Sequence, residues 1–117
     1  LPAVAWADSG LLRPGDAVFA AGHLFELGLL VTGGIHSGTI GPGDRTSGRV
    51  YLATDAPVMM GSAGGPLLDA AGRVVGVLVG SFGTSLERSI GIAVPAAVAR
   101  PVLERLRSGP TPRGGLD

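Results

Sequence analysis

The chain has 117 residues, of which 45% are hydrophobic, so it is long enough for one domain with a buried core. Nine arginines balance nine acidic residues, and a formal net charge of zero argues against the basic surface of a nucleic-acid-binding domain. There is no cysteine, so disulfides play no part and the redox compartment stays open. No apolar run approaches the roughly 18 residues that a membrane helix needs. The first residue is not methionine and no signal peptide follows it, so we expect the numbering to begin inside a longer protein.

Turn signals open the chain, at residues 8–10 (DSG) and 13–16 (RPGD), and predict a connecting segment over residues 1–16. Beyond it, the 21 Gly and 9 Pro lie between short apolar runs, which is typical of many short strands. Such strands, with almost no helix, indicate an antiparallel barrel. The predicted strands are residues 17–22, 27–35, 49–54, 66–68, 73–79 and 90–94, with loops at 38–48, 55–65 and 80–89 and a tight turn at 69–72.

One helix is predicted, over residues 96–107. Its apolar residues Val98, Val102 and Leu106 recur at a spacing of four, which places them on one face. Pro101 falls inside this stretch and predicts a kink or a later start of the helix. The remaining residues, 108–117, are rich in Pro and Gly and are predicted to be a linker.

The most informative stretch is residues 61–67 (GSAGGPL). Its small residues allow a tight turn whose successive backbone N–H groups point into one concavity and hold an anion or a carbonyl oxygen. The stretch resembles the Gly-Asn/Asp-Ser-Gly-Gly-Pro turn of trypsin-fold serine proteases, in which the serine is the nucleophile. Ala63 stands at the position of that serine, and a methyl group cannot attack a carbonyl carbon.

Further motifs resemble the HtrA/Deg family of trypsin-fold proteases, and they follow one another in that family's order. Residues 113–116 (RGGL) are also similar to the start of a PDZ domain that follows the protease domain in the family, although this match is short. The stronger matches are residues 15–22 (GDAVFAAG), 32–37 (TGGIHS), 54–56 (TDA), 72–77 (GRVVGV) and 90–95 (IGIAVP).

The resemblance implies an all-β fold, the antiparallel six-stranded Greek-key barrel of the trypsin-like serine proteases with one C-terminal helix. It implies the second of two barrels, so the first barrel, which supplies the catalytic His and Asp in the family, is not in this chain. The implied divisions are a connection between the barrels (1–16), the second barrel (17–95), the helix (96–107) and a linker, possibly toward a PDZ domain (108–117).

The resemblance also implies the site residues. The oxyanion hole would be formed by backbone N–H groups of Gly61, Ser62 and Ala63. The segment Leu78, Val79 and Gly80 matches the strand that pairs with the substrate backbone. Residues 57–58, Pro57 and Val58, would form the floor of the specificity pocket, and the lack of an acidic residue there favours small apolar side chains over Arg or Lys.

Three departures from the family pattern bear on the site. Residues 23–26 (HLFE) replace the family's Asn-Pro-Phe-Gly, which predicts a different loop. Met59 and Met60 replace Asn-Pro before the nucleophile turn, which alters the specificity pocket, although methionine more often packs than recognises a ligand. Ala63 replaces the nucleophile and removes catalysis.

Other candidate residues are interpreted as structural. Ser62 lies one residue before the nucleophile position, and a serine there also needs a base within reach, so a catalytic Ser62 is disfavoured. Asp55 matches a structural aspartate of the family. His23 and His36 match Asn and Val rather than the catalytic His, which predicts structural or exposed histidines and no metal site. No P-loop or dinucleotide motif is present, so no cofactor is expected.

Three hypotheses follow. The first is a fragment of an HtrA-like serine endopeptidase that acts in protein quality control on peptides or unfolded proteins, in which an engineered change of serine to Ala63 prevents self-cleavage. The second is a natural pseudoprotease, a peptide-binding or assembly module. The third is a structural half that pairs with a missing first barrel or with itself, because a lone barrel exposes an apolar face. The codon at position 63 of the natural gene separates the first two.

The family resemblance implies an extracytoplasmic location in a bacterium, in the periplasm or cell envelope.

Overall fold

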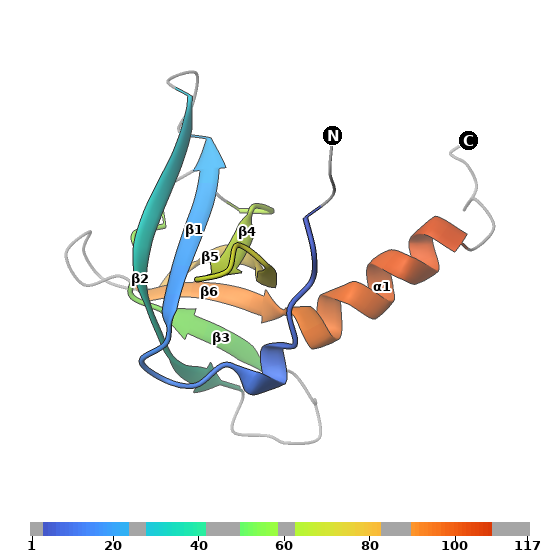
Figure 1. Cartoon of the computed structure of the whole chain (residues 1–117), viewed down its shortest axis with the longest axis horizontal. Helices are drawn as coiled ribbons and strands as arrows, with labels where there is room; N and C mark the ends of the chain where they lie inside the picture. The colour runs from blue at the N-terminus through green and yellow to red at the C-terminus, as the bar shows by residue number, and fades with distance from the viewer. Residues whose placement is uncertain (1–3, 24–27, 42–49, 59–62, 83–89, 109–117) are drawn as a thin grey trace.

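Six antiparallel strands close into a barrel in the order β1-β2-β3-β6-β5-β4 in the computed structural model (Figure 1). The structure describes residues 4–23, 28–41, 50–58, 63–82 and 90–108. A 3-10 turn precedes the barrel and one helix follows it. The elements are η1 (Ser9–Leu11), β1 (Ala17–His23), β2 (Leu29–Ile40), β3 (Tyr51–Thr54), β4 (Pro66–Asp69), β5 (Val74–Phe82), β6 (Ile90–Pro95) and α1 (Ala96–Ser108).

The barrel that the sequence predicts is therefore confirmed, including its six strands and its C-terminal helix. β3 pairs with β6 instead of β4, so the chain crosses over between sequential strands, and β1 pairs with β4 to close the barrel. The core contains both alanines and larger Val and Leu side chains, and side chains of this kind fill the interior of a small barrel. The core is formed by Val18, Ala20, Leu52, Ala56, Leu67, Val75, Leu78 and Ala93.

Two strands are longer than predicted. β2 continues to Ile40, whereas a loop was expected from residue 38. The strand passes through an irregularity between His36 and Gly38, where Gly38 has a φ of 149°, and then pairs with β3. β5 continues to Phe82 instead of ending at residue 79, through a second irregularity between Leu78 and Gly80. Bulges insert a residue without ending a strand, and the local sequence pattern does not reveal them.

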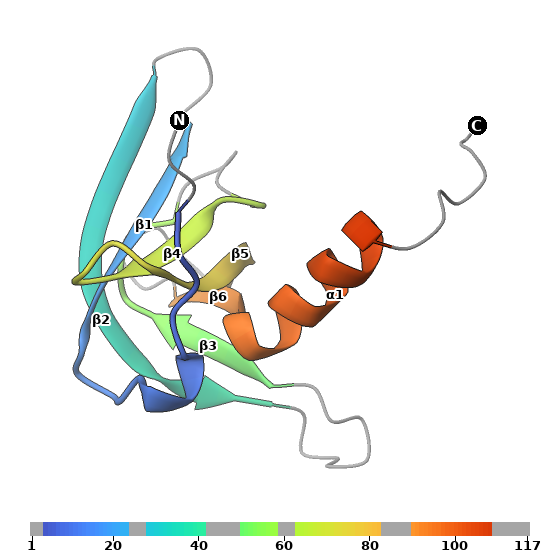
Figure 2. The same cartoon turned by 45° about the vertical axis from the view of Figure 1, so that its right-hand side comes forward.

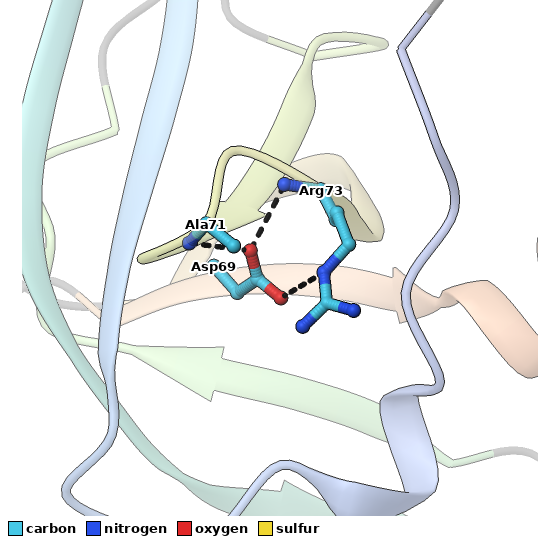
Figure 3. Close-up of polar contacts among 3 residues, drawn as sticks. All are labelled: Asp69, Ala71 and Arg73. Atoms are coloured by element: carbon cyan, nitrogen blue, oxygen red, sulfur yellow. Dashed lines mark hydrogen bonds and ion pairs between the residues drawn. The ribbon is translucent and has the colours of Figure 1, made fainter.

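A tight turn joins β4 to β5 at the predicted position, and Asp69 organises it (Figure 3). The Asp69 Oδ1 atom accepts the backbone N–H groups of Ala71 and Arg73, each at 2.9 Å, and Oδ2 lies 3.2 Å from Arg73 Nε. Gly72 has a φ of 80°, a left-handed conformation that glycine adopts without strain. The turn thus fixes the register of the β4–β5 hairpin through one carboxylate.

Helix α1 leads away from the barrel in both views of the molecule (Figures 1 and 2). Pro101 lies inside the helix without ending it. Ala96 is its buried residue, and the predicted apolar face is exposed, with Val98 at 49%, Val102 at 43% and Leu106 at 66%. The Ser9 hydroxyl oxygen accepts the Ala97 N–H at 3.1 Å and ties the first turn of the helix to η1. The described part of the chain contains no helix with the length and apolarity to cross a bilayer.

Candidate functional site

The turn that carries the nucleophile position is docked on β5. Ala63 is exposed and directly precedes Gly64, whose φ of 90° suits glycine. The Gly64 N–H donates to the Leu78 carbonyl oxygen at 2.7 Å, and the Leu78 N–H donates to the Gly65 carbonyl oxygen at 2.8 Å. These two bonds fix where the backbone of the turn lies relative to the barrel. Gly61 and Ser62, together with Met59 and Met60, lie outside the described residues.

Leu78 has no backbone group left for a substrate, because the turn uses both of them. Its side chain is fully buried in the core. The pairing of β4 with β5 ends at Pro66 and Val77, so within the described residues no strand lies beside Val79 and Gly80 on that side. Of the three residues expected to pair with a substrate backbone, Val79 and Gly80 are therefore the two that lie along an open edge.

The expected pocket residues come from the segment that follows β3. The Pro57 carbonyl oxygen accepts the Thr32 hydroxyl at 2.6 Å. Val58 lies against Gly91 of β6, where an added Cβ would come within 2.5 Å of the Val58 Cγ2 atom. Thr54 pairs with Gly91, and Gly91 pairs with Ser81. Residues 57–58, which follow Thr54, and the open edge of β5, which precedes Ser81, therefore lie at the same end of the barrel.

Asp55 uses its carboxylate to hold the backbone of β2. Its Oδ1 atom accepts the Ile35 N–H at 2.8 Å. The neighbouring Thr54 hydroxyl donates to the Ile35 carbonyl at 2.7 Å and accepts the Ala56 N–H at 3.1 Å. These bonds agree with the structural interpretation of Asp55 and give it no place in acid–base chemistry.

The two histidines differ in environment. His23 is exposed at the end of β1. His36 is 2% exposed, and its Nδ1 atom has no hydrogen-bond partner in the part of the chain that the structure describes. Burial lowers the pKa of His36 from 6.5, while a hydrogen bond with the Ala53 backbone and the Asp16 carboxylate act in the opposite direction. Within the described residues, no three His, Cys, Asp or Glu side chains come together in a group that could hold a metal ion.

Sequence reasoning missed the residues of other strands that contact residues 54–58, namely Thr32, Gly34 and Gly91. All three lie in motifs already singled out, Thr32 and Gly34 in TGGIHS and Gly91 in IGIAVP, but those motifs were interpreted as strands. For Gly34 and Gly91 the sequence did hold a signal, because a glycine inside a strand often marks the close approach of another backbone or side chain.

Comparison with known proteins identifies the family. The trypsin-like peptidase domain matches residues 1–77 of the chain. This chain belongs to the trypsin-like peptidase family. Two similar relatives are both described as a probable periplasmic serine endoprotease DegP-like. The one from Rhizobium meliloti (strain 1021) is 40% identical over 118 residues, covering 97% of this chain and 23% of the relative. The one from Rickettsia conorii (strain ATCC VR-613 / Malish 7) is 37% identical over 124 residues, covering 99% and 24%.

Solved structures agree with the trypsin-like assignment. The HtrA-type protease AlgW with tripeptide superposes with a TM-score of 0.81 and 34% identity, over 92% of this chain and 36% of that chain. The same protease with decapeptide gives a TM-score of 0.79 and 32% identity, over 92% and 34%. The HtrA/Deg resemblance is thus confirmed. This trypsin-like peptidase chain spans about a quarter of the length of the curated relatives that it matches.

Proposed function

We propose that this chain is the second barrel of an HtrA-like serine endopeptidase and that it supplies the oxyanion turn, the specificity pocket and the substrate-pairing edge. The observation that carries the proposal is the pair of hydrogen bonds between Leu78 and residues 64–65. They hold residues 64–65 beside Val79 and Gly80. A peptide that pairs with this strand while its carbonyl enters an oxyanion hole requires the two features to be neighbours. The chemistry needs protein groups alone, so the proposal includes no cofactor.

Ala63 determines what such a site does. Acyl transfer needs an activated serine, a general base and an orienting carboxylate in addition to oxyanion donors. The histidine and the aspartate would come from a first barrel. An oxyanion donor stabilises the transition state by roughly 3 kcal/mol. Without a nucleophile at position 63 there is no covalent step, and the same donors hold a substrate carbonyl or a product carboxylate. The chain as written is therefore proposed to bind without cleaving.

The proposed ligand is a peptide or an unfolded protein segment in extended conformation. An extended segment pairs its backbone with the open edge at Val79 and Gly80 and places one side chain toward Pro57 and Val58. Val58 and Pro57 are apolar, and Val58 already fills the space over Gly91, so a short apolar side chain fits better than a long or charged one. The names of the relatives favour an extracytoplasmic protein, and we extend the proposal to that location.

A natural pseudoprotease is the second candidate, favoured by Ala63 in a sequence that keeps the Gly64-Gly65-Pro66 that follows it in the family motif. The complete protein that carries this chain, as encoded and as its Ala63→Ser variant, separates the two. Cleavage of a permanently unfolded protein by the variant, together with labelling by a fluorophosphonate, supports the endopeptidase. Retained cleavage after adding Ser62→Ala assigns the reaction to position 63. If neither form cleaves the unfolded protein but both bind it, the result contradicts the endopeptidase and supports the pseudoprotease.

A further inference from the structure

The pocket segment, which we define as residues 54–58, is fastened to the backbone of β2. Thr54 and Asp55 bond both backbone groups of Ile35 through their side chains, at 2.7 and 2.8 Å. The Asp55 N–H also donates to the Ile35 carbonyl, at 3.4 Å. All these contacts lie in the first half of the segment. They fix its start and leave its second half, Pro57 and Val58, to other interactions.

Gly34 shows how close the pocket segment comes to β2. A Cβ at Gly34 would lie 2.5 Å from the Ala56 nitrogen and 2.7 Å from the Ala56 Cα, and it would also overlap the Asp55 Oδ1 atom. Ala56 is 1% exposed and belongs to the core. The segment therefore crosses the strand at a point where glycine is the residue that leaves enough room.

Among the described residues, one hydrogen bond holds the second half of the pocket segment. Proline has no backbone N–H, so the carbonyl is the sole backbone hydrogen-bonding group of Pro57. That carbonyl accepts the Thr32 hydroxyl at 2.6 Å, whereas the other acceptor near this hydroxyl, the Ala20 carbonyl, lies at 3.5 Å. On the opposite side, Val58 packs on Gly91. The side chain of Thr32 is thus the polar group that sets the distance from Pro57 to β2.

We propose that Thr32 is a positioning residue that holds Pro57 and Val58 at the floor of the specificity pocket. The proposal rests on the proposed function, because it takes these two residues as the pocket floor. Thr32 contacts the backbone of the floor and not the substrate. Loss of its hydroxyl lets the floor move away from β2, so the pocket admits larger side chains and holds small ones less firmly.

The first test needs no catalysis and uses the full chain with Ala63. Amide hydrogen exchange at Val58 is compared, by nuclear magnetic resonance, in the native chain and in the Thr32→Val, Thr32→Ser and Thr39→Val variants. Thr32→Val keeps the shape but removes the hydroxyl, and we expect exchange at Val58 to become about fivefold faster, which is the factor for the loss of a typical hydrogen bond. Thr32→Ser keeps the hydroxyl and restores the native rate. Thr39→Val makes the same change elsewhere on β2, at a residue that pairs with Leu52, and leaves the rate unchanged.

The second test measures whether the pocket floor determines which substrate side chain the protein prefers. In the complete protein with Ala63→Ser, kcat/KM is measured for peptides with alanine or phenylalanine at the residue before the cleaved bond. We expect Thr32→Val to reduce the preference for alanine about fivefold, mainly through KM, and Thr32→Ser to restore it. An unchanged preference overturns the positioning role even if exchange at Val58 increases. Equal exchange in Thr32→Val and the native chain overturns it at the first step. Absence of cleavage in every Ala63→Ser background removes the proposed function instead, and the exchange comparison still shows whether Thr32 holds the segment.

Discussion

At the scale of single residues, His36 is a described titratable group whose charged form the fold disfavours. It is 2% exposed and its Nδ1 atom lacks a partner among the described residues, so burying a second proton there carries a desolvation cost. Burial lowers its pKa from 6.5 in the folded chain, and the opposing effects of the Ala53 backbone and the Asp16 carboxylate are smaller. The sequence predicted a structural or an exposed role for this histidine, and the structure shows it buried.

The first prediction is a loss of stability in acid. Below a pH of about 6.5 the unfolded chain protonates His36 while the folded chain does not, because the folded pKa is the lower one. The free energy of unfolding is therefore highest above pH 6.5 and falls as the pH drops from there to the folded pKa. Urea denaturation at a series of pH values between 8 and 5 measures this slope, with the pH range chosen around the ordinary histidine value.

A pair of variants isolates the contribution of His36. The His36→Val variant loses the part of the slope that begins near pH 6.5. The His23→Gln variant, at an exposed position on β1, keeps it. A slope that is the same in the native chain and in His36→Val would show that other groups are responsible.

At the scale of elements, the β4–β5 hairpin depends on one carboxylate (Figure 3). Asp69 accepts two backbone N–H groups of the turn, and its ion pair with Arg73 is made by a guanidinium group that is 55% exposed. The hydrogen bonds to the backbone hold the turn, whereas an exposed ion pair contributes little.

The second prediction follows from this difference. Asp69→Ala leaves two turn N–H groups without their acceptor and lowers the free energy of unfolding by about 1–2 kcal/mol. Arg73→Ala removes the ion pair alone and changes it by less than about 1 kcal/mol. Urea denaturation at pH 7 compares both variants with Asp69→Asn, which keeps an oxygen acceptor and recovers most of the loss. An effect of Arg73→Ala as large as that of Asp69→Ala would contradict the assignment.

The third prediction concerns two glycines in strands. Gly34→Ala places a methyl group onto Ala56 and the Asp55 carboxylate and destabilises the chain by about 3 kcal/mol or more. Gly80→Ala meets no atom within 4 Å, and because alanine loses less backbone entropy than glycine, it changes the stability by less than about 1 kcal/mol. Thermal and urea unfolding distinguish the two. Similar stabilities would mean that the pocket segment does not lie against β2.

Element boundaries show where local patterns stop being informative. Residues 73–79 were predicted as a strand from their β-branched and apolar side chains, and β5 does begin there, at Val74. Its continuation through Gly80 was not predicted, because pairing with β6 maintains it rather than side-chain alternation. Gly38 was likewise assigned to a loop, because its place in β2 depends on pairing with β3 and not on side-chain alternation.

At the scale of the whole molecule, barrel and helix contribute unequally to stability. The barrel encloses side chains such as Leu67, which is fully buried, whereas helix α1 extends outward with Leu106 66% exposed (Figure 2). The apolar face of the helix follows the predicted spacing, but the barrel described here does not cover it.

The fourth prediction compares the same substitution in the two places. Leu67→Ala creates a cavity in the closed core and lowers the free energy of unfolding by about 2–5 kcal/mol. Leu106→Ala removes an exposed side chain and changes it by less than about 0.5 kcal/mol. Denaturation in urea, followed by circular dichroism, measures both. A loss of several kcal/mol from Leu106→Ala in the isolated chain would show that another surface covers the helix.

The class of fold follows from local features of the sequence, and so does the proposed place of the candidate site. Alternating apolar strands, glycine-rich turns and the order of the family motifs are properties of short stretches, and each is fixed by the side chains within it. The proposed assignment of Ala63 to the nucleophile position likewise rests on the sequence motif alone. The tertiary structure decided which groups serve which partner. Both backbone groups of Leu78 form hydrogen bonds with the turn, the Thr32 hydroxyl bonds to the Pro57 carbonyl, and Val58 packs against Gly91. These contacts connect residues far apart in the chain, and they exist because the register of the closed barrel brings their strands together, which no local pattern specifies.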